Sequence, residues 1–304
     1  MNGEAATQVT TGYVRARVHL PADAMWPNVS EAVAATLPGG WETSALAGAD
    51  SDRLPSITID QVDVPVVTHD GQNYQLALPS DHLLSLRLAY LTYTLLERHR
   101  QLAGMNTVHA AGAAVPSGGA VLILGDKGSG KTNTLFALAK LGYRPAGDDL
   151  VVLRLSGGGV DLFPGNRSAA VRGPAMPDTL YYEAKQHVRL DHQHSFLAAP
   201  VPVTHVVRIS VHAAAPGVIL TKAARLSLGE RLRLHENLGR YVSGLPTPLT
   251  VDDTGCYGPV LCIDNPACAQ MRRDLIEQLG HISFYYLQAR SAAEAAQLIA
   301  KEVG

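Results

Sequence analysis

The stretch "LILGDKGSGKTNTLFALAKLGYRPAGDDL", residues 122–150 of the 304-residue chain, decides the fold. An apolar run ends at Leu124, and residues 125–132 then match the pattern Gly-x-x-x-x-Gly-Lys-Thr. A helical pattern follows from Lys131 and stops at Gly142, a residue type suited to ending a helix. In such a strand–turn–helix arrangement, the glycine-rich turn directs its backbone N–H groups at the phosphates of a nucleotide. The helix that follows adds the positive end of its dipole. The stretch therefore predicts a nucleotide-binding loop.

Two residues at the start of the predicted helix have expected chemical roles. The Lys131 ammonium should reach the β and γ phosphates, and the Thr132 hydroxyl should ligate Mg²⁺. The residues expected to surround the nucleotide belong to the loop and the first helical turn: Gly125, Lys127, Gly128, Ser129, Gly130, Lys131, Thr132 and Asn133. ATP and Mg²⁺ are therefore the expected cofactors, with GTP left open.

An aspartate pair follows the predicted helix after a short interval. The helix from Lys131 to Gly142 travels roughly 18 Å at 1.5 Å per residue. The extended segment from Tyr143 to Asp148 covers about 20 Å at 3.3 Å per residue. If the chain doubles back, Asp148 and Asp149 return to the phosphate end, where one carboxylate can ligate a metal and the other can accept a proton from an attacking hydroxyl. The alternative is a solvated Asp-Asp turn before the next strand.

The remaining patterns divide the chain into two predicted domains. Residues 1–105 combine alternating strand patterns with a helical pattern over 81–102, which predicts an α+β domain. Residues 106–304 alternate strands and helices around the phosphate loop, with a hairpin over 150–164 and a last helix over 291–303. The fold class expected is α/β.

Composition excludes several other classes of protein. The net charge of −2 and pI near 6.6 give no basic face for a nucleic acid. No apolar run reaches the roughly 20 residues that span a bilayer, and the N-terminal residues lack a secretory pattern, so we expect a cytoplasmic protein without a membrane partner. Cys256, Cys262 and Cys268 lack the paired spacing of a zinc site.

The segment "GDKGSGKTNTLFALAKLGYRPAGDDLVVL", preceded by "HAAGAAV", resembles the nucleotide-binding core of the HPr kinase/phosphorylase family. The resemblance spans His109 to Leu153 and is greatest to the smaller HPr-kinase-like relatives found with peptide-modification systems. More distantly, "GDD" after a Gly-Lys-Thr loop is similar to the phosphoenolpyruvate carboxykinase superfamily. The resemblance implies a P-loop core with a mixed sheet.

The resemblance also implies ATP- and Mg²⁺-dependent phosphorylation of a serine or threonine hydroxyl in a peptide or protein, as in a peptide natural-product pathway. It implies Asp148 as the base, Asp149 with Thr132 as metal ligands, and Lys131 as the phosphate clamp. His109 matches a histidine that precedes the loop in that family. A small-molecule alcohol such as free serine, and a non-catalytic nucleotide-binding regulator, are the alternatives. The sequence leaves a homo-oligomer open.

Downstream, the chain departs from the family pattern. Ala170 stands where the bifunctional family places a glutamate shortly before an Arg-Gly pair, here beginning at Arg172, and this departure argues against a second metal and a phosphorylase reaction. The family's Gly-Arg-Asn segment is only loosely matched around Arg240. Lys185 and Arg189 lie on a predicted loop, where contact with the substrate competes with a solvent-facing role.

Overall fold

The computed structural model describes residues 6–20, 29–46, 53–61, 66–78, 86–172, 185–245, 247 and 262–304. Contacts divide the chain into two compact units. The first unit combines residues 1–107 with 235–273, and the second combines 108–234 with 274–304. The sequence placed a boundary at 105/106 and assigned everything beyond it to one domain. It did not anticipate that 235–273 would pack with the N-terminal residues.

The first unit is built on a six-stranded mixed sheet in the order β3-β1-β2-β4-β6-β5. Its strands are β1 (Ala6–Thr11), β2 (Val14–His19), β3 (Trp41–Ala45), β4 (Ser56–Gln61), β5 (Val66–His69) and β6 (Asn73–Leu78). Its helices among the described residues include α1 (Glu31–Ala34), α3 (Leu86–Leu95) and α4 (Glu97–Leu102). The single helix predicted over 81–102 is interrupted at Leu96, and its predicted start lies outside the described residues.

A buried polar cluster connects α4 to the strand that follows it. Glu97 is fully buried and accepts hydrogen bonds from Arg100 Nε at 2.7 Å, from the Thr107 backbone N–H at 2.9 Å and from the Thr107 hydroxyl at 2.6 Å. Arg100 is also fully buried, and its guanidinium lies 3.9 Å from the centre of the Tyr93 ring. Because each charge is buried beside its partner, neither carries the full cost of an isolated ion.

The second unit carries a nine-stranded mixed sheet in the order β10-β8-β9-β15-β12-β11-β7, with β17 paired to β15 and β16 paired to β17. The strands are β7 (Met105–Val108), β8 (Ala111–Ala114), β9 (Ala120–Leu124), β10 (Arg144–Gly147), β11 (Val151–Ser156), β12 (Gly159–Phe163), β15 (Val201–Val211), β16 (Ile219–Lys222) and β17 (Ser283–Ala289). The chain passes from the first unit to the second within β7. Strands β9, β15 and β17 are parallel neighbours, and the remaining pairs that are described are antiparallel.

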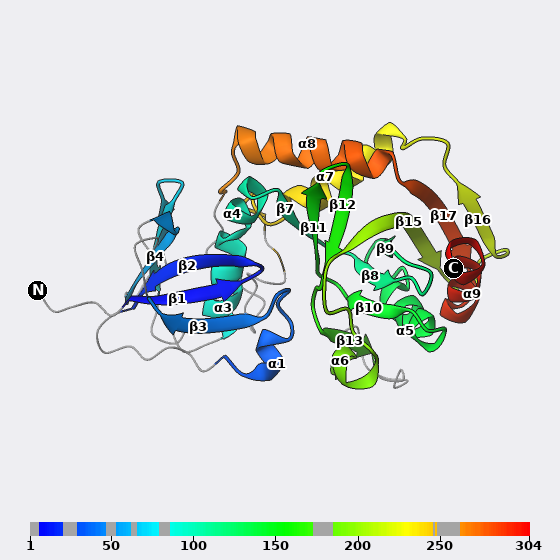
Figure 1. The fold of residues 1–304 in the computed structure, drawn as a ribbon, viewed down its shortest axis with the longest axis horizontal. Coiled ribbons are helices and arrows are strands. Elements are labelled where there is room, and N and C mark those ends of the chain that lie inside the picture. Colours follow the sequence, from blue (N-terminus) through cyan, green and yellow to red (C-terminus); the bar gives the residue numbers. More distant parts are fainter. Residues whose placement is uncertain are drawn as a thin grey trace, which may run out of the picture. The chain divides into compact units, whose positions relative to one another are not determined.

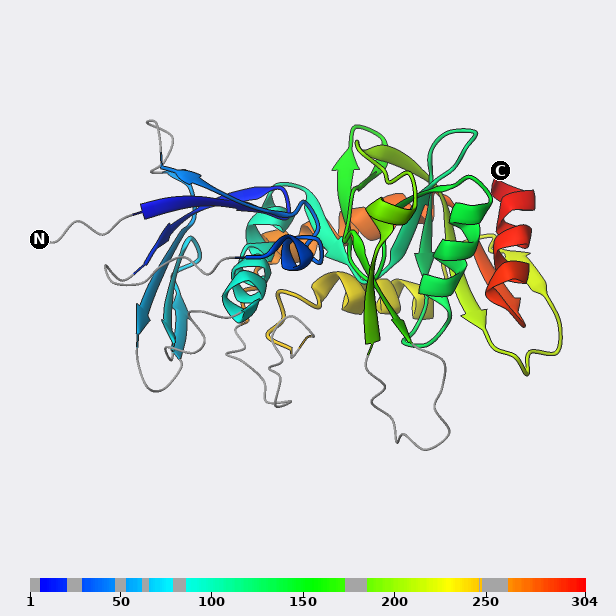
Figure 2. The ribbon, with the colours of Figure 1, turned by 90° about the horizontal axis from the view of Figure 1, so that it is seen from below.

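Two helices cover one face of this sheet beside β9. Helices α5 (Lys131–Lys140) and α9 (Ala292–Val303) pack against each other and against the apolar side chains of that face, among them Ile123, Val207 and Leu287 (Figures 1 and 2). The short ribbon β13 (Ser168–Arg172) and β14 (Lys185–Arg189) leads into α6 (Leu190–Gln193). Helices α7 (Leu228–Gly239) and α8 (Pro266–Gly280) complete the fold.

Several predicted elements are confirmed. The α5 helix begins at Lys131, the hairpin predicted over 150–164 is formed by β11 and β12, and Ser291 caps α9 by accepting a hydrogen bond from the Glu294 N–H at 3.2 Å. The fold class is mixed α/β, as expected. No helix in the described part of the chain is long and apolar enough to cross a membrane.

Candidate active site

The glycine-rich loop joins β9, whose residues are all buried, to α5. Gly130 forms the N-cap of the helix in the left-handed region, with φ 93° and ψ 12°. A Cβ atom there would lie 2.7 Å from Val211 Cβ, so both conformation and space require glycine at this position. The carbonyl of Ser129 accepts a hydrogen bond from the Val211 N–H at 2.9 Å, which ties the loop to the end of β15.

Lys131 lies folded over the start of the loop. Its Nζ donates to the carbonyl oxygen of Gly125 at 2.8 Å and to that of Asp126 at 3.1 Å. The side chain is buried, and this burial lowers the pKa of Lys131 while the nearby carboxylates of Asp149 and Asp148 oppose the shift. The ammonium is therefore held by neutral carbonyls in a position where a polyanion would gain from its charge.

Asp148 follows β10 and is almost completely buried, with 1% of its surface exposed. The Thr132 hydroxyl lies 3.1 Å from one of its carboxylate oxygens and 2.9 Å from the other. Burial, together with the charge of Asp149, raises the pKa of Asp148 to about 6, and the hydrogen bond from Thr132 opposes that rise. The chain therefore does double back after α5, and it brings the Asp148 carboxylate to the first turn of that helix.

Asp149 has a different environment although it is the next residue. Its backbone has a φ of 65°, in the left-handed region, and its side chain is 54% exposed. Its Oδ1 lies 3.1 Å from Nδ1 of His109, which is in the segment between β7 and β8. The sharp change of backbone direction therefore separates two adjacent carboxylates, one facing Thr132 and the other facing His109.

Close backbone packing supports this turn. The N–H of Asp148 donates to the carbonyl of Asn166 at 3.3 Å, and the N–H of Asn166 donates to the carbonyl of Leu150 at 2.8 Å. A Cβ on Gly147 would come within 2.9 Å of the Cα of Gly165. The segment around Gly165 thus packs against the backbone of the turn that carries the two aspartates and holds it in place. Sequence patterns did not reveal this role.

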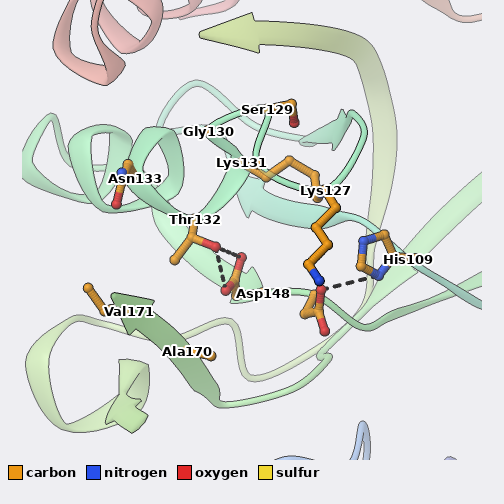
Figure 3. Close-up of a pocket in the computed structure, with 12 residues that line it drawn as sticks. His109, Lys127, Ser129, Gly130, Lys131, Thr132, Asn133, Asp148, Ala170 and Val171 are labelled. Atoms are coloured by element: carbon orange, nitrogen blue, oxygen red, sulfur yellow. Dashed lines mark hydrogen bonds and ion pairs between the residues drawn. The ribbon is translucent and has the colours of Figure 1, made fainter. Parts of the chain in front are cut away.

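One cavity of about 250 Å³ brings the predicted residues together (Figure 3). It is lined by His109, Lys127, Gly128, Ser129, Gly130, Lys131, Thr132, Asn133, Asp148, Asp149, Ala170 and Val171. Ala170, the position at which the resembling family has a carboxylate, faces this cavity from β13 with only a methyl group. Gly125 borders a different cavity, which shares no lining residue with the first.

Arg189 and Arg240, which the sequence also suggested, are not among the described residues that line this cavity. Arg189 makes two hydrogen bonds to Asp191, at 2.9 and 2.8 Å, and does not line the cavity. Arg240 falls in the first unit, just after α7. Arg172 and Lys185 are register partners in the β13–β14 ribbon, and their side chains lie outside the described residues. Cys256 also lies outside them, while Cys262 and Cys268 are free thiols.

The oxygen atoms around the cavity fit a hard divalent cation. Mg²⁺ prefers oxygen ligands and takes only one or two carboxylates from the protein beside phosphate oxygens. Thr132 and Asp148 offer such a donor pair. Within the described ranges, no three residues of the types His, Cys, Asp and Glu gather as a metal cluster.

Sequence patterns missed an ion pair next to the loop. Arg208 on β15 is the register partner of Leu124, the last residue of β9. Its Nε lies 2.8 Å from each carboxylate oxygen of Glu230, and the Glu230 side chain is fully buried on α7. The available signal was an arginine inside the otherwise apolar run "VVRISV", because a charge in a buried strand needs a partner.

Comparisons with known proteins give a distant structural likeness. No protein-family model matches the chain, and no curated protein matches its sequence. Among solved structures, the chain is similar to the HPr(Ser) kinase/phosphatase from Coxiella burnetii, with a TM-score of 0.35 and 13% identity over 65% of this chain and 93% of that chain. The likeness is weak, and it is compatible with the mixed α/β fold.

Proposed function

We propose that this protein is an ATP- and Mg²⁺-dependent kinase that transfers the γ-phosphoryl group to a serine or threonine hydroxyl of a peptide or protein. The observation that carries the proposal is the gathering of a glycine-rich loop, Lys131, Thr132 and two carboxylates around one cavity. Phosphoryl transfer depends on positioning and on neutralisation of charge, which these groups supply.

The loop is suited to hold the phosphates. Backbone N–H groups at the start of a ten-residue helix and the charge of Lys131 all favour an anion at this point. Thr132 and Asp148 would hold Mg²⁺, whose chemistry here is to neutralise charge on the phosphate oxygens. Among the side-chain donors that are described, only the Thr132 hydroxyl donates a hydrogen bond to Asp148. The carboxylate oxygens of Asp148 are therefore suited to exchange this hydrogen bond for a bond to Mg²⁺.

The two carboxylates are proposed to divide the work according to their contacts. The resemblance implies Asp148 as base and Asp149 as metal ligand, but the contact between Asp148 and Thr132 favours the reverse order. Asp149 is exposed enough to meet an incoming hydroxyl, and His109 orients it. The acceptor oxygen then bonds to the γ phosphorus, the bond from that phosphorus to the β–γ bridging oxygen breaks, the hydroxyl proton goes to Asp149, and ADP leaves.

The test is incubation of the purified protein with Mg²⁺, ATP and candidate peptides, followed by mass spectrometry. A kinase adds one phosphate to an acceptor, and Asp148→Asn and Asp149→Asn each abolish this gain. Asp161→Asn is the matched control, because Asp161 pairs with Arg154 on the β11–β12 hairpin. GTP in place of ATP identifies the preferred nucleotide.

Two other functions remain as outcomes of the same test. A small-molecule kinase would phosphorylate free serine or a related alcohol and leave peptides unchanged. A regulator would bind nucleotide without transfer, and its partner-dependent behaviour would survive Asp149→Asn. The carboxylate pair that follows β10, beside the first turn of α5, favours phosphoryl transfer, because a regulator does not need a proton acceptor beside the phosphates.

A further inference from the structure

The glycine-rich loop directs a second lysine, Lys127, into the cavity that both aspartates line. The N–H of Ser129 donates to the carbonyl oxygen of Asp126 at 3.1 Å, which closes a β-turn with Lys127 and Gly128 at its two central positions. Gly128 has a φ of 83°, the positive value that a type II turn requires at the second of these positions. The turn separates two neighbouring charges, because Lys127 lines the cavity of the aspartates whereas Asp126 lines the cavity that Gly125 borders.

The two lysines of the aspartate cavity are held differently. The Lys131 ammonium donates to two loop carbonyls, at 2.8 and 3.1 Å, which leaves one of its three N–H groups for a phosphate. Among the residues that the structure describes, none forms an ion pair or a hydrogen bond with the Lys127 ammonium. Figure 3 shows the Lys127 side chain extended from the loop into the cavity, on the side of His109. Lys127 therefore offers all three of its N–H groups to a ligand.

The charges around a bound γ phosphate favour a contact with Lys127. On the proposed function, the γ-phosphoryl group comes within reach of Asp149, so two anionic groups face each other during the transfer. Asp148 would hold Mg²⁺, which offsets part of this repulsion. The wall formed by β13 offers only the apolar side chains of Ala170 and Val171. The remaining neutralisation falls to the two lysines, and Lys127 is the one whose ammonium the described part of the protein does not already engage.

We propose that Lys127 is a further catalytic residue, whose ammonium binds the γ phosphate and not the α or β phosphates. In the transition state the ammonium donates to oxygens of the transferring phosphoryl group, over which the negative charge is spread. Lys127 keeps its protons throughout, and the bond changes are those described above, with the hydroxyl proton going to Asp149. The flexible four-carbon stem lets the ammonium follow the phosphoryl group from ATP toward the acceptor. This inference rests on the proposed function.

Nucleotides that differ in the γ phosphate test this contact without any acceptor. Isothermal titration calorimetry compares Mg²⁺–ADP with the Mg²⁺ complex of the β,γ-imido analogue of ATP, which keeps the γ phosphate but resists transfer. Lys127→Met removes the ammonium and keeps the length of the stem. We expect this variant to bind the imido analogue about tenfold more weakly than the wild type and to bind ADP equally well, since one charge-assisted hydrogen bond is lost.

Two further variants connect the effect to the charge at this position. Lys127→Arg keeps a cation in the loop and should bind the imido analogue more tightly than Lys127→Met does. Lys140→Met is the matched control, because Lys140 is the exposed last residue of α5 and does not line the cavity. It should bind both nucleotides as the wild type does. An unchanged affinity of Lys127→Met for the imido analogue, or an equal loss of affinity for both nucleotides, overturns the inference.

Rates of transfer separate this inference from the proposed function. With an acceptor found by mass spectrometry, Lys127→Met should lower kcat about 100-fold and leave the KM of the acceptor unchanged. If Lys127→Met weakens only the imido analogue but the wild type phosphorylates no acceptor, the γ-phosphate contact is supported and the kinase function is not. If Lys127→Met transfers phosphate as fast as the wild type, the inference is wrong and the kinase function stands. A wild type that binds neither nucleotide overturns both.

Discussion

The Thr132 hydroxyl donates to both carboxylate oxygens of Asp148, at 3.1 and 2.9 Å, and so joins the first turn of α5 to the end of β10. These residues are 16 positions apart, and the helix and the strand between them must run in opposite directions for the contact to form. The contact brings a nearly buried acid to the N-terminal end of a helix that follows a glycine-rich loop.

The burial of Asp148 should lower the stability of the folded protein at neutral pH. Its pKa rises from 3.8 to about 6 on folding, so the folded state favours the protonated form. Below about pH 3.8 the wild type should have the same free energy of unfolding as a protein with a neutral side chain at position 148. This free energy should fall below that of the neutral variant as the pH rises from there through about 6. Asp148→Asn should therefore raise the free energy of unfolding at pH 7 by about 2–3 kcal/mol, measured by urea denaturation without Mg²⁺ or nucleotide. At pH 3.5 the two proteins should be equally stable, and a stability gain that persists there contradicts the assignment.

The charge of Lys131 should be essential for nucleotide affinity. Lys131→Met keeps the length of the buried stem and removes the ammonium, so affinity for ATP should fall about 100-fold, equivalent to about 2.7 kcal/mol. Isothermal titration calorimetry measures this change. Lys140→Met, at the exposed last residue of the same helix, should bind ATP as the wild type does. Equal losses in both variants would show that helix stability, and not the ammonium, controls binding.

Asp149 should be dispensable for folding and required for transfer. Asparagine tolerates the left-handed backbone found at this position, so Asp149→Asn should unfold at the same urea concentration as the wild type. Its rate of phosphoryl transfer should fall about 100-fold or more, because a positioned proton acceptor contributes that much. Asp149→Ala should lose the same activity and about 1 kcal/mol of stability in addition. Retained transfer in Asp149→Asn would return the role of base to Asp148.

Gly165, which packs against the backbone that follows the two aspartates, should tolerate no side chain. A Cβ on Gly165 would collide with the carbonyl oxygen of Leu150 and lie 2.9 Å from the Cα of Val151. Gly165→Ala should therefore cost about 1–3 kcal/mol of stability and slow transfer by displacing Asp148. Gly157→Ala, in the β11–β12 turn with no atom within 4 Å of its Cβ, should stay within about 0.5 kcal/mol of the wild type. Thermal unfolding of Gly165→Ala, Gly157→Ala and the wild type measures the two changes in stability.

The buried Glu97 cluster should dominate the stability of the first unit. Glu97→Gln keeps the shape but leaves the buried Arg100 without its counter-charge, so we expect a loss of about 3–5 kcal/mol in urea denaturation. Glu277→Gln breaks an exposed pair with Arg231, and its effect on the free energy of unfolding should be much smaller. Similar effects of the two changes would mean that the buried pair is no more important than a surface one.

The strand, glycine-rich loop and helix over residues 120–140 could be predicted from the local sequence, because the residues that determine them are contiguous. The apolar run of β9, the glycines at 128 and 130 with their positive φ angles, and the helical pattern from Lys131 all lie within one stretch, and each is a backbone preference that needs no distant partner. The segment lengths also showed that Asp148 and Asp149 can return to the start of α5 if the chain doubles back. The composition, without basic excess or a long apolar run, already indicated a globular protein, and the strand and helix patterns indicated the α/β class.

Only the tertiary structure decided what each aspartate contacts. Asp148 is buried against Thr132 and Asp149 turns toward His109 because the segment around Gly165 packs beneath their turn, and that segment is distant in sequence. In the same way, the packing of 235–273 with the N-terminal unit and the pairing of Arg208 with Glu230 depend on contacts between remote residues. Burial and charge pairing are properties of the assembled core, so the local pattern of residues cannot reveal them.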